Sequence, residues 1–157
     1  MDSLDNDNLN NDSNPKVSLE HIQSLIENYR SNQLTHINQQ LEIEDAHSIW
    51  FSLGTLKSFI ARIEEETQKI DSSTLENDLG IRFYYAAYPE VPEAPIPENF
   101  SKKHTLVMVP TKRINGLNHD FNPFDEENVL AVTGKMALAQ NHGDLVPPGA
   151  STNIESY

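Results

Sequence analysis

Four of the nine residues from position 89 to position 97 are proline, and this stretch limits the fold more than any other feature of the chain. Proline lacks a backbone N–H and fixes φ, so neither a helix nor an interior strand can run through a segment this rich in proline. We therefore expect an extended loop of the polyproline type. Its Pro-x-x-Pro spacing could also fit a partner's groove, but the neighbouring charges are Glu rather than Arg, and loop prolines more often only stiffen the chain.

Apolar runs that suit β-strands lie on both sides of this loop. Residues 81–88, IRFYYAAY, are apolar or aromatic on both faces, which is typical of a central strand. Residues 104–111, HTLVMVPT, form a second run, which we expect Pro110 to end. The two runs therefore predict an antiparallel pair joined across the proline loop.

The first of these runs is rich in tyrosine. Tyr84, Tyr85 and Tyr88, together with Arg82, could line a pocket. Aromatic residues of strands more often belong to the core or to a sheet face, so we expect that role for them here.

Two amphipathic helices are predicted in the first half of the chain. Ser18 and Ser52 are suitable N-caps, and each precedes apolar residues at helical spacing. We expect the first helix to continue to about residue 41, with a break near residues 31–32, and a short strand at 48–51 to follow it. The apolar stripes begin with Leu19, Ile22, Leu25, Ile26 and Tyr29 in the first helix and with Leu53, Leu56, Phe59, Ile60 and Ile63 in the second.

These elements predict an α+β fold, in which the two N-terminal amphipathic helices pack on a small, mainly antiparallel sheet. An irregular C-terminal lobe, residues 114–157, would wrap this core. Residues 1–15 are rich in Asn and Asp and predict a disordered acidic tail, which leaves residues 16–157 as a single domain. Within the lobe, residues 129–142 could form a short strand and one or two helical turns that Gly143 ends. The predicted sheet uses residues 48–51, 81–88 and 104–110.

The charge and the composition exclude several classes of protein. With 24 acidic against 11 basic residues, the net charge is −13, which argues against nucleic-acid binding. Such a charge most often serves only solubility, and the alternative is a surface that attracts a basic partner protein or cations. The absence of cysteine excludes disulfides and thiolate sites, and it suits a reducing cytoplasm. No apolar run approaches the ~20 residues that span a bilayer, and the acidic start of the chain does not resemble a signal peptide.

The candidate site residues come from two similar motifs, Asn-His-Asp at 118–120 and Asn-His-Gly-Asp at 141–144, and from a histidine that opens a predicted strand. Imidazoles and carboxylates bind divalent metals, and histidine beside aspartate suits a general base. No spacing forces these groups to converge, and the same residue types favour turns. The alternative is that 141–144 forms a turn, with Pro147 and Pro148 holding the tail extended. The candidate metal ligands are His104, His119, Asp120, His142 and Asp144.

Four segments, taken together, carry a resemblance: SIWFSLGTLKSFI, GIRFYYAAYPE, HTLVMVPT and NHGDLVPP. In this order they resemble an uncharacterised family of small bacterial proteins, over roughly residues 45 to 148. That family has no known activity, so the resemblance assigns no catalytic residue.

Two functions remain open from the sequence. The first, which we favour, is a non-enzymatic acidic module of the inhibitor, immunity or adaptor type that binds another protein, because no catalytic motif such as Gly-x-Ser-x-Gly occurs. The second is a metal-binding domain or metal-dependent hydrolase that uses the His and Asp residues of the C-terminal lobe. The sequence does not indicate an organic cofactor or an oligomeric state.

Overall fold

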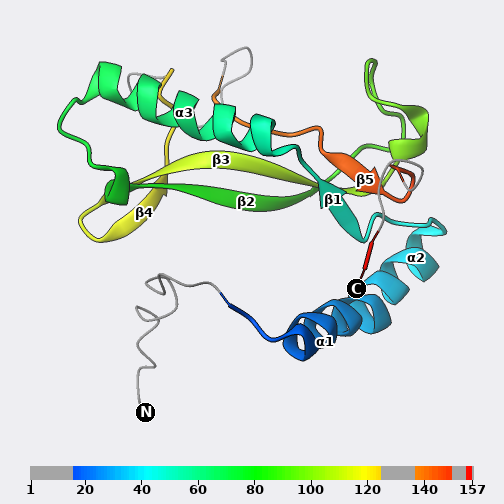
Figure 1. Cartoon of the computed structure of the whole chain (residues 1–157). Helices are drawn as coiled ribbons and strands as arrows, with labels where there is room; N and C mark the ends of the chain where they lie inside the picture. Colours follow the sequence, from blue (N-terminus) through cyan, green and yellow to red (C-terminus); the bar gives the residue numbers. More distant parts are fainter. Residues whose placement is uncertain (1–15, 125–136, 150–154, 157) are drawn as a thin grey trace.

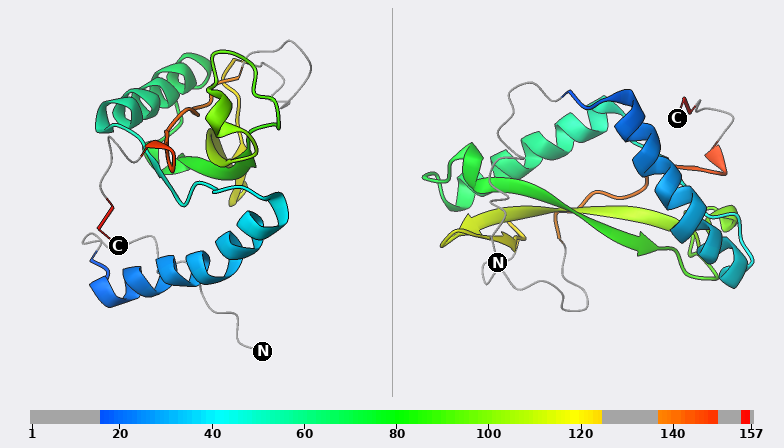
Figure 2. Two further views of the ribbon diagram at one scale, coloured as in Figure 1. Left: turned by 90° about the vertical axis from the view of Figure 1, so that its right-hand side faces the viewer. Right: turned by 90° about the horizontal axis from the view of Figure 1, so that it is seen from below.

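The computed structural model describes residues 16–124, 137–149 and 155–156. Over these residues the fold is mixed α+β, with two helical segments and two small antiparallel sheets. Helix α3 runs along one side of the larger sheet, and the helix α1–α2 lies on the other side (Figures 1 and 2). The predicted acidic tail lies outside the described residues, and so does most of the strand and helix predicted from residue 129 onward.

The first helix is continuous, and at residues 31–32, where a break was one expectation, it changes to π geometry. It comprises α1 (Leu19–Tyr29), a π-helical segment η2 (Arg30–Leu34) and α2 (Thr35–Leu41). Ser18 caps it as expected, because its hydroxyl accepts the N–H of His21 at 3.2 Å. At residues 31–32 the side chains bond one turn back, Ser31 Oγ to the carboxylate of Glu27 at 2.5 Å and Asn32 Nδ2 to the carbonyl of Asn28 at 2.7 Å, and the helix changes to π geometry instead of ending.

The second helix, α3 (Leu53–Ile70), packs on the sheet as predicted. Ser52 caps it by accepting the N–H of Thr55 at 3.0 Å. Phe59 and Ile63 on its inner side form a buried cluster with Met108 of the sheet. The described core clusters do not confirm the same packing for the first helix, since α1 and α2 contribute no residue to them.

The larger sheet contains the strand pair that we expected across the proline loop. Strands β2 (Leu79–Ala87) and β3 (His104–Ile114) are antiparallel, and β4 (Leu117–Asp120) follows on the far side of β3. The order β2-β3-β4 shows that the prediction of β2 as a central strand was wrong. It is one of the two edge strands, and β3 is central. The strands are strongly twisted, and they cross when the molecule is seen from below (Figure 2, right).

Strand β3 also continues past Pro110, where we expected it to end. Pro110 lies opposite Ile81 at a position whose backbone groups face away from β2, so its missing N–H removes no bond to that strand. Its carbonyl accepts the N–H of Phe121 at 2.9 Å. The strand therefore tolerates this proline and runs on to Ile114.

The segment after β3 is a hairpin and not the irregular loop we predicted. Asn115 and Gly116 have positive φ values of 51° and 78°, as in the tight turn that Asn-Gly favours between antiparallel strands. The sequence contained this signal, and the prediction of an irregular lobe from residue 114 overlooked it.

The predicted strand at 48–51 belongs to a second sheet. Strand β1 (Ser48–Trp50) pairs antiparallel with β5 (Asp144–Val146), so it does not extend the β2–β3 pair. The 141–144 motif is also not the predicted turn. His142 holds the left-handed conformation with φ 66°, and Gly143 lets the backbone lie against the side chains of β1.

A second buried cluster joins this small sheet to the proline loop. Ala46, Tyr88 and Leu145 are buried together, and Ile96 of the loop packs against them. Phe100, at the end of the loop, lies with its ring 5.5 Å from that of Tyr88. The loop is thus fixed against the end of the β2–β3 pair. It is not the extended polyproline segment that we expected, because it turns at residues 94–95, where the N–H of Ile96 donates to the carbonyl of Glu93 at 3.0 Å.

Candidate functional site

His104 forms the most buried ion pair among the described residues, with Asp45. The Asp45 side chain is fully buried and accepts the backbone N–H groups of Ala46 and His104 at 2.9 and 2.6 Å. Its second oxygen bonds Nδ1 of the His104 ring, whose side chain is one-third exposed. Such a carboxylate fixes the ring orientation and leaves Nε2 as the group that can meet a ligand. The sequence analysis did not select Asp45, because 59 residues separate it from His104.

Tyr29, at the end of α1, lies close to this pair. Burial raises the pKa of the Tyr29 hydroxyl, and the Asp45 carboxylate and Tyr85 raise it further. The π-helical turn begins with the next residue, so Tyr29 lies where the helix departs from regular geometry. Such turns occur frequently at functional sites.

The carboxylate of Glu155, near the end of the chain, contacts two residues from separate segments. Oε2 of Glu155 lies 3.1 Å from Nδ1 of His47 and 3.5 Å from Nη2 of Arg30. All three side chains are partly buried, so Glu155 connects the first helix to the segment that leads into β1.

The side chain of Asp120, in β4, makes contacts that hold the sheet together. Its two oxygens bond the Arg82 guanidinium and the Tyr84 hydroxyl of β2, across the sheet. Arg82 also donates to the carbonyl of Asn118 at 3.0 Å. The Asp120 carboxylate is therefore neutralised and fully engaged, and it ties the two outer strands together over β3.

The remaining candidates lie apart. His119 is exposed opposite Lys112 in β4, His142 is exposed after the bridge to β3, and Asp144 is exposed opposite Trp50 in the second sheet. Position 112 and His104 are eight residues apart along β3, which is about 26 Å at 3.3 Å per residue.

The five candidates therefore do not form one metal centre. In the parts of the chain that the structure describes, no group of three or more His, Asp and Glu residues could hold a metal ion. Each motif is used locally instead, Asn118 to Asp120 as strand β4 and Asn141 to Asp144 as the entry into β5.

The free edge of β2 is the surface that the sequence analysis missed. The N–H of Tyr88 donates to the carbonyl of Lys103 at 3.0 Å, which sets the alternation of the ladder. Residues 82, 84 and 86 accordingly bond β3, while Ile81, Phe83 and Tyr85 direct their N–H and C=O groups outward. Met108, opposite Phe83, confirms this alternation because it exchanges both its bonds with Gln140, at 2.8 and 2.9 Å, on the other side of β3.

The side chains along this edge are exposed and aromatic. Phe83 is 54% exposed and Tyr85 is 87% exposed, whereas Tyr88 is buried as we expected of a strand aromatic. Phe83 and Tyr85 point to the same face of the sheet, since side chains two apart in a strand share a face. The expectation that these aromatics belong to the core or to a sheet face thus holds for Tyr88, which is in the core, and for Tyr85, which lies on an exposed sheet face.

An open groove lies where α3 meets the start of this edge. It has a volume of about 940 Å³, and Leu79, Gly80 and Ile81 of β2 line it. Glu64 and Glu76 add two carboxylates to its walls, and Arg113 of β3 adds a guanidinium. The groove therefore carries charges of both signs and extends from the start of β2 across β3.

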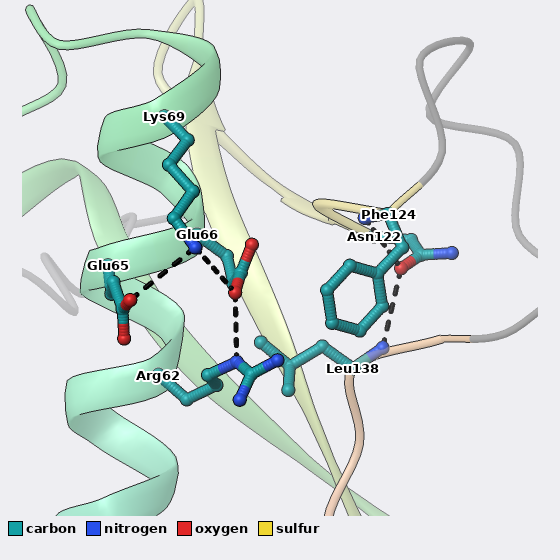
Figure 3. A network of polar contacts seen from close by, with 7 residues as sticks. All are labelled: Arg62, Glu65, Glu66, Lys69, Asn122, Phe124 and Leu138. Atoms are coloured by element: carbon teal, nitrogen blue, oxygen red, sulfur yellow. Dashed lines mark hydrogen bonds and ion pairs between the residues drawn. The ribbon is translucent and has the colours of Figure 1, made fainter.

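A polar network on α3 has a structural role. Lys69 contacts Glu65 and Glu66 at 3.4 and 3.1 Å, and Arg62 contacts Glu66 at 2.9 Å (Figure 3). Hydrogen bonding to Lys69 is the main reason why the pKa of Glu66 is lowered. The Arg62 guanidinium also lies 5.9 Å from the centre of the Phe124 ring.

Asn122, beside this network, joins two separate stretches of chain. Its side-chain oxygen accepts the N–H groups of Phe124 and Leu138 at 3.2 and 3.3 Å (Figure 3). It is buried, and it holds the segment at 137–140 against β3, where Gln140 completes the ladder.

Comparisons with protein-family models, with curated protein sequences and with solved structures found no match to this chain. The resemblance to small bacterial proteins therefore stays a prediction, and the function must be argued from the site. Among the described residues, no helix has the length and apolarity required to cross a bilayer.

Proposed function

We propose that the protein is a non-enzymatic, acidic interaction module that binds a basic segment of another protein through strand β2. The observation that carries this proposal is the exposure of Phe83 and Tyr85 along an edge that no other described strand covers. Exposed aromatic residues beside unpaired backbone groups are typical of a surface that recognises a partner. A cytoplasmic location, as the lack of cysteine suggests, is part of the same proposal.

The charge around β2 supports a basic partner. From residue 76 to residue 98 the chain has five acidic residues and a single basic one, Arg82. Asp120 already neutralises Arg82. Of the five carboxylates, Glu90 pairs with Lys102 at 3.5 Å. Three basic residues of the neighbouring segment lie beside the ends of β2: Lys112, which pairs with Asp71 at 3.0 Å, Arg113 and Lys103. Carboxylates still outnumber them, so the surface near the edge is negative on balance and attracts lysine and arginine.

The proposal can be tested with a photo-crosslinking amino acid placed at Tyr85. Irradiation in cells or in a lysate of the natural host should give a discrete adduct that weakens as salt is raised. The same residue placed at Lys57, which is exposed on α3, should not give this adduct. Equal labelling from both positions, or no adduct from either, would contradict the proposal.

A metal-binding role at His104 is the second candidate, although no three described His, Asp or Glu residues come together around it. A buried carboxylate that holds Nδ1 of a histidine is the usual support for a metal ligand at Nε2. Elemental analysis of protein purified without chelator, beside His104→Ala and His142→Ala variants, tests this role. Stoichiometric metal that only the His104 variant loses would support it, and metal-free protein in all three samples would reject it.

A further inference from the structure

We infer that the partner binds β2 by strand addition, as an extended segment with basic residues at both ends and alternating β-forming residues between them. This inference rests on the proposed function and specifies its partner. Along β2, every second residue from Ile81 to Ala87 directs an N–H and a C=O away from β3, by the alternation that the Tyr88 and Met108 bonds establish. Only another extended backbone matches donors and acceptors at this spacing.

The edge lacks the features that usually prevent strand addition. Natural edge strands are protected by proline, by lysine, by bulges or by a covering segment. Strand β2 has no proline before Pro89, and its one charged side chain, Arg82, is bound to Asp120. Its register with β3 runs from Leu79 to Ala87 without a bulge. Nine residues span about 30 Å, so a partner of similar length could pair along the whole edge.

The side chains and charges define which strand fits. In an added strand, the residues opposite Phe83 and Tyr85 would lie beside two exposed rings, where β-branched side chains pack well. Carboxylates flank β2 on both sides in the sequence, with Glu76 and Asp78 before it and Glu93 and Glu98 after it, and they outnumber Arg113 and Lys103, the basic residues beside its two ends. Lysine or arginine at the two ends of the added strand would therefore be attracted from both sides.

A second copy of the chain is a poorer occupant of the same edge. Antiparallel pairing of two β2 strands would bring Glu76 and Asp78 of one copy toward Glu93 and Glu98 of the other. Each copy also carries a net charge of −13. Like charges in contact oppose such a dimer, whereas they favour a basic strand.

The inference can be tested with the synthetic peptide KKTVTVTVTKK and with EETVTVTVTEE as its charge-reversed control. Fluorescence anisotropy with the full chain at low salt should show at least tenfold tighter binding of the lysine peptide. Two N-methylated versions of it, blocked at alternating backbone positions, should differ, because only one set of amides can face β2. Methylation of that set should weaken binding at least tenfold, and methylation of the other set should change it less than threefold.

The variants Tyr85→Pro and Tyr85→Thr test the same backbone contact by altering the protein instead of the peptide. Proline removes an outward N–H that β3 does not use, so Tyr85→Pro should lose peptide binding while Tyr85→Thr retains most of it. A circular dichroism spectrum shows whether each variant is folded. The N-methylated peptides test the same contact on the unaltered protein, so a misfolded variant does not remove the test.

Three results would overturn the inference. The first is equal weakening by both methylated sets, and the second is equal binding of the lysine and glutamate peptides. The third is a stable dimer of the free protein, seen by sedimentation, that Tyr85→Pro converts to a monomer. A crosslink from position 85 in the absence of peptide binding would retain the proposed function and reject strand addition, whereas the loss of both would reject both.

Discussion

Strands β2 and β3 look alike in sequence and differ in the structure. Both are apolar runs beside the proline loop, but Met108 of β3 is fully buried while Phe83, its neighbour across the ladder, is 54% exposed. The difference lies in what covers the two strands: β3 has β2 on one side and β4 with Gln140 on the other, whereas β2 has β3 alone among the described strands. Apolar composition therefore predicts a strand, but it does not predict whether the strand is central or at an edge.

The largest expected difference in stability is that between truncation of Met108 and truncation of Phe83, which lie opposite each other in the β2–β3 pair. Met108→Ala should destabilise the protein by about 3 kcal/mol, because it removes buried contacts with Phe59 and Ile63 and leaves a cavity. Phe83→Ala should cost less than about 1 kcal/mol, because over half of that ring is already in water. Urea unfolding of both variants measures the difference. Equal losses would mean that β2 is as well covered as β3.

The second largest loss of stability should come from Asp45. Its carboxylate accepts the N–H of His104, the first amide of β3, whereas the outward amides of β2 have no such acceptor among the described residues. Asp45→Ala should cost between about 2 and 3 kcal/mol, because it leaves the His104 and Ala46 N–H groups without their acceptor. Glu44→Ala, which removes the exposed neighbouring carboxylate, is the control and should be nearly neutral. Thermal unfolding that is unchanged in the Asp45 variant would contradict this role.

Two glycine-to-alanine substitutions test the packing of the segment around Gly143, which follows the bridge between Gln140 and β3. A methyl group on Gly143 would lie 2.4 Å from Ile49 and 2.7 Å from Phe51, so Gly143→Ala should cost about 2 kcal/mol and loosen the β1–β5 pairing. The control is Gly54→Ala, where the nearest atom is 3.9 Å away. It should raise stability by up to about 1 kcal/mol through helix propensity. Urea unfolding compares them, and the same sign for both would refute the packing argument.

The smallest effect should come from Asp71, whose carboxylate joins the end of α3 to Lys112 of β3 at 3.0 Å. Hydrogen bonds from Ser73 and then from Lys112 lower the pKa of Asp71, so the folded state favours the charged form. This contribution is present above the unfolded pKa near 3.9 and is lost as the pH falls below it. The difference in melting temperature between the wild type and Asp71→Asn should therefore be present at pH 7 and shrink toward pH 2. The control is Glu65→Gln, on the exposed side of α3. Its melting temperature at pH 7 should differ less from that of the wild type than the melting temperature of Asp71→Asn does.

Candidate sites were harder to predict than elements. His119 and Asp120 are adjacent in strand β4, where neighbouring side chains point to opposite faces of the sheet, and Asp120 found its partners in Arg82 and Tyr84, 38 and 36 residues away. The pair that did form, Asp45 with His104, joins residues that no motif connects. A short motif indicates a site only when the fold is known to bring its residues together, and here the register of β3 separates them.

The sequence by itself determined the local features of this protein. Ser18 and Ser52 begin helices because their hydroxyls bond amides three residues away, and the proline loop imposes a connection between two strands because it can form neither helix nor ladder. The tertiary structure decided which strand became the edge, which sheet β1 joined and which carboxylate met His104. These outcomes depend on partners that are distant along the chain, and the free energy of such contacts is gained only when packing brings them together.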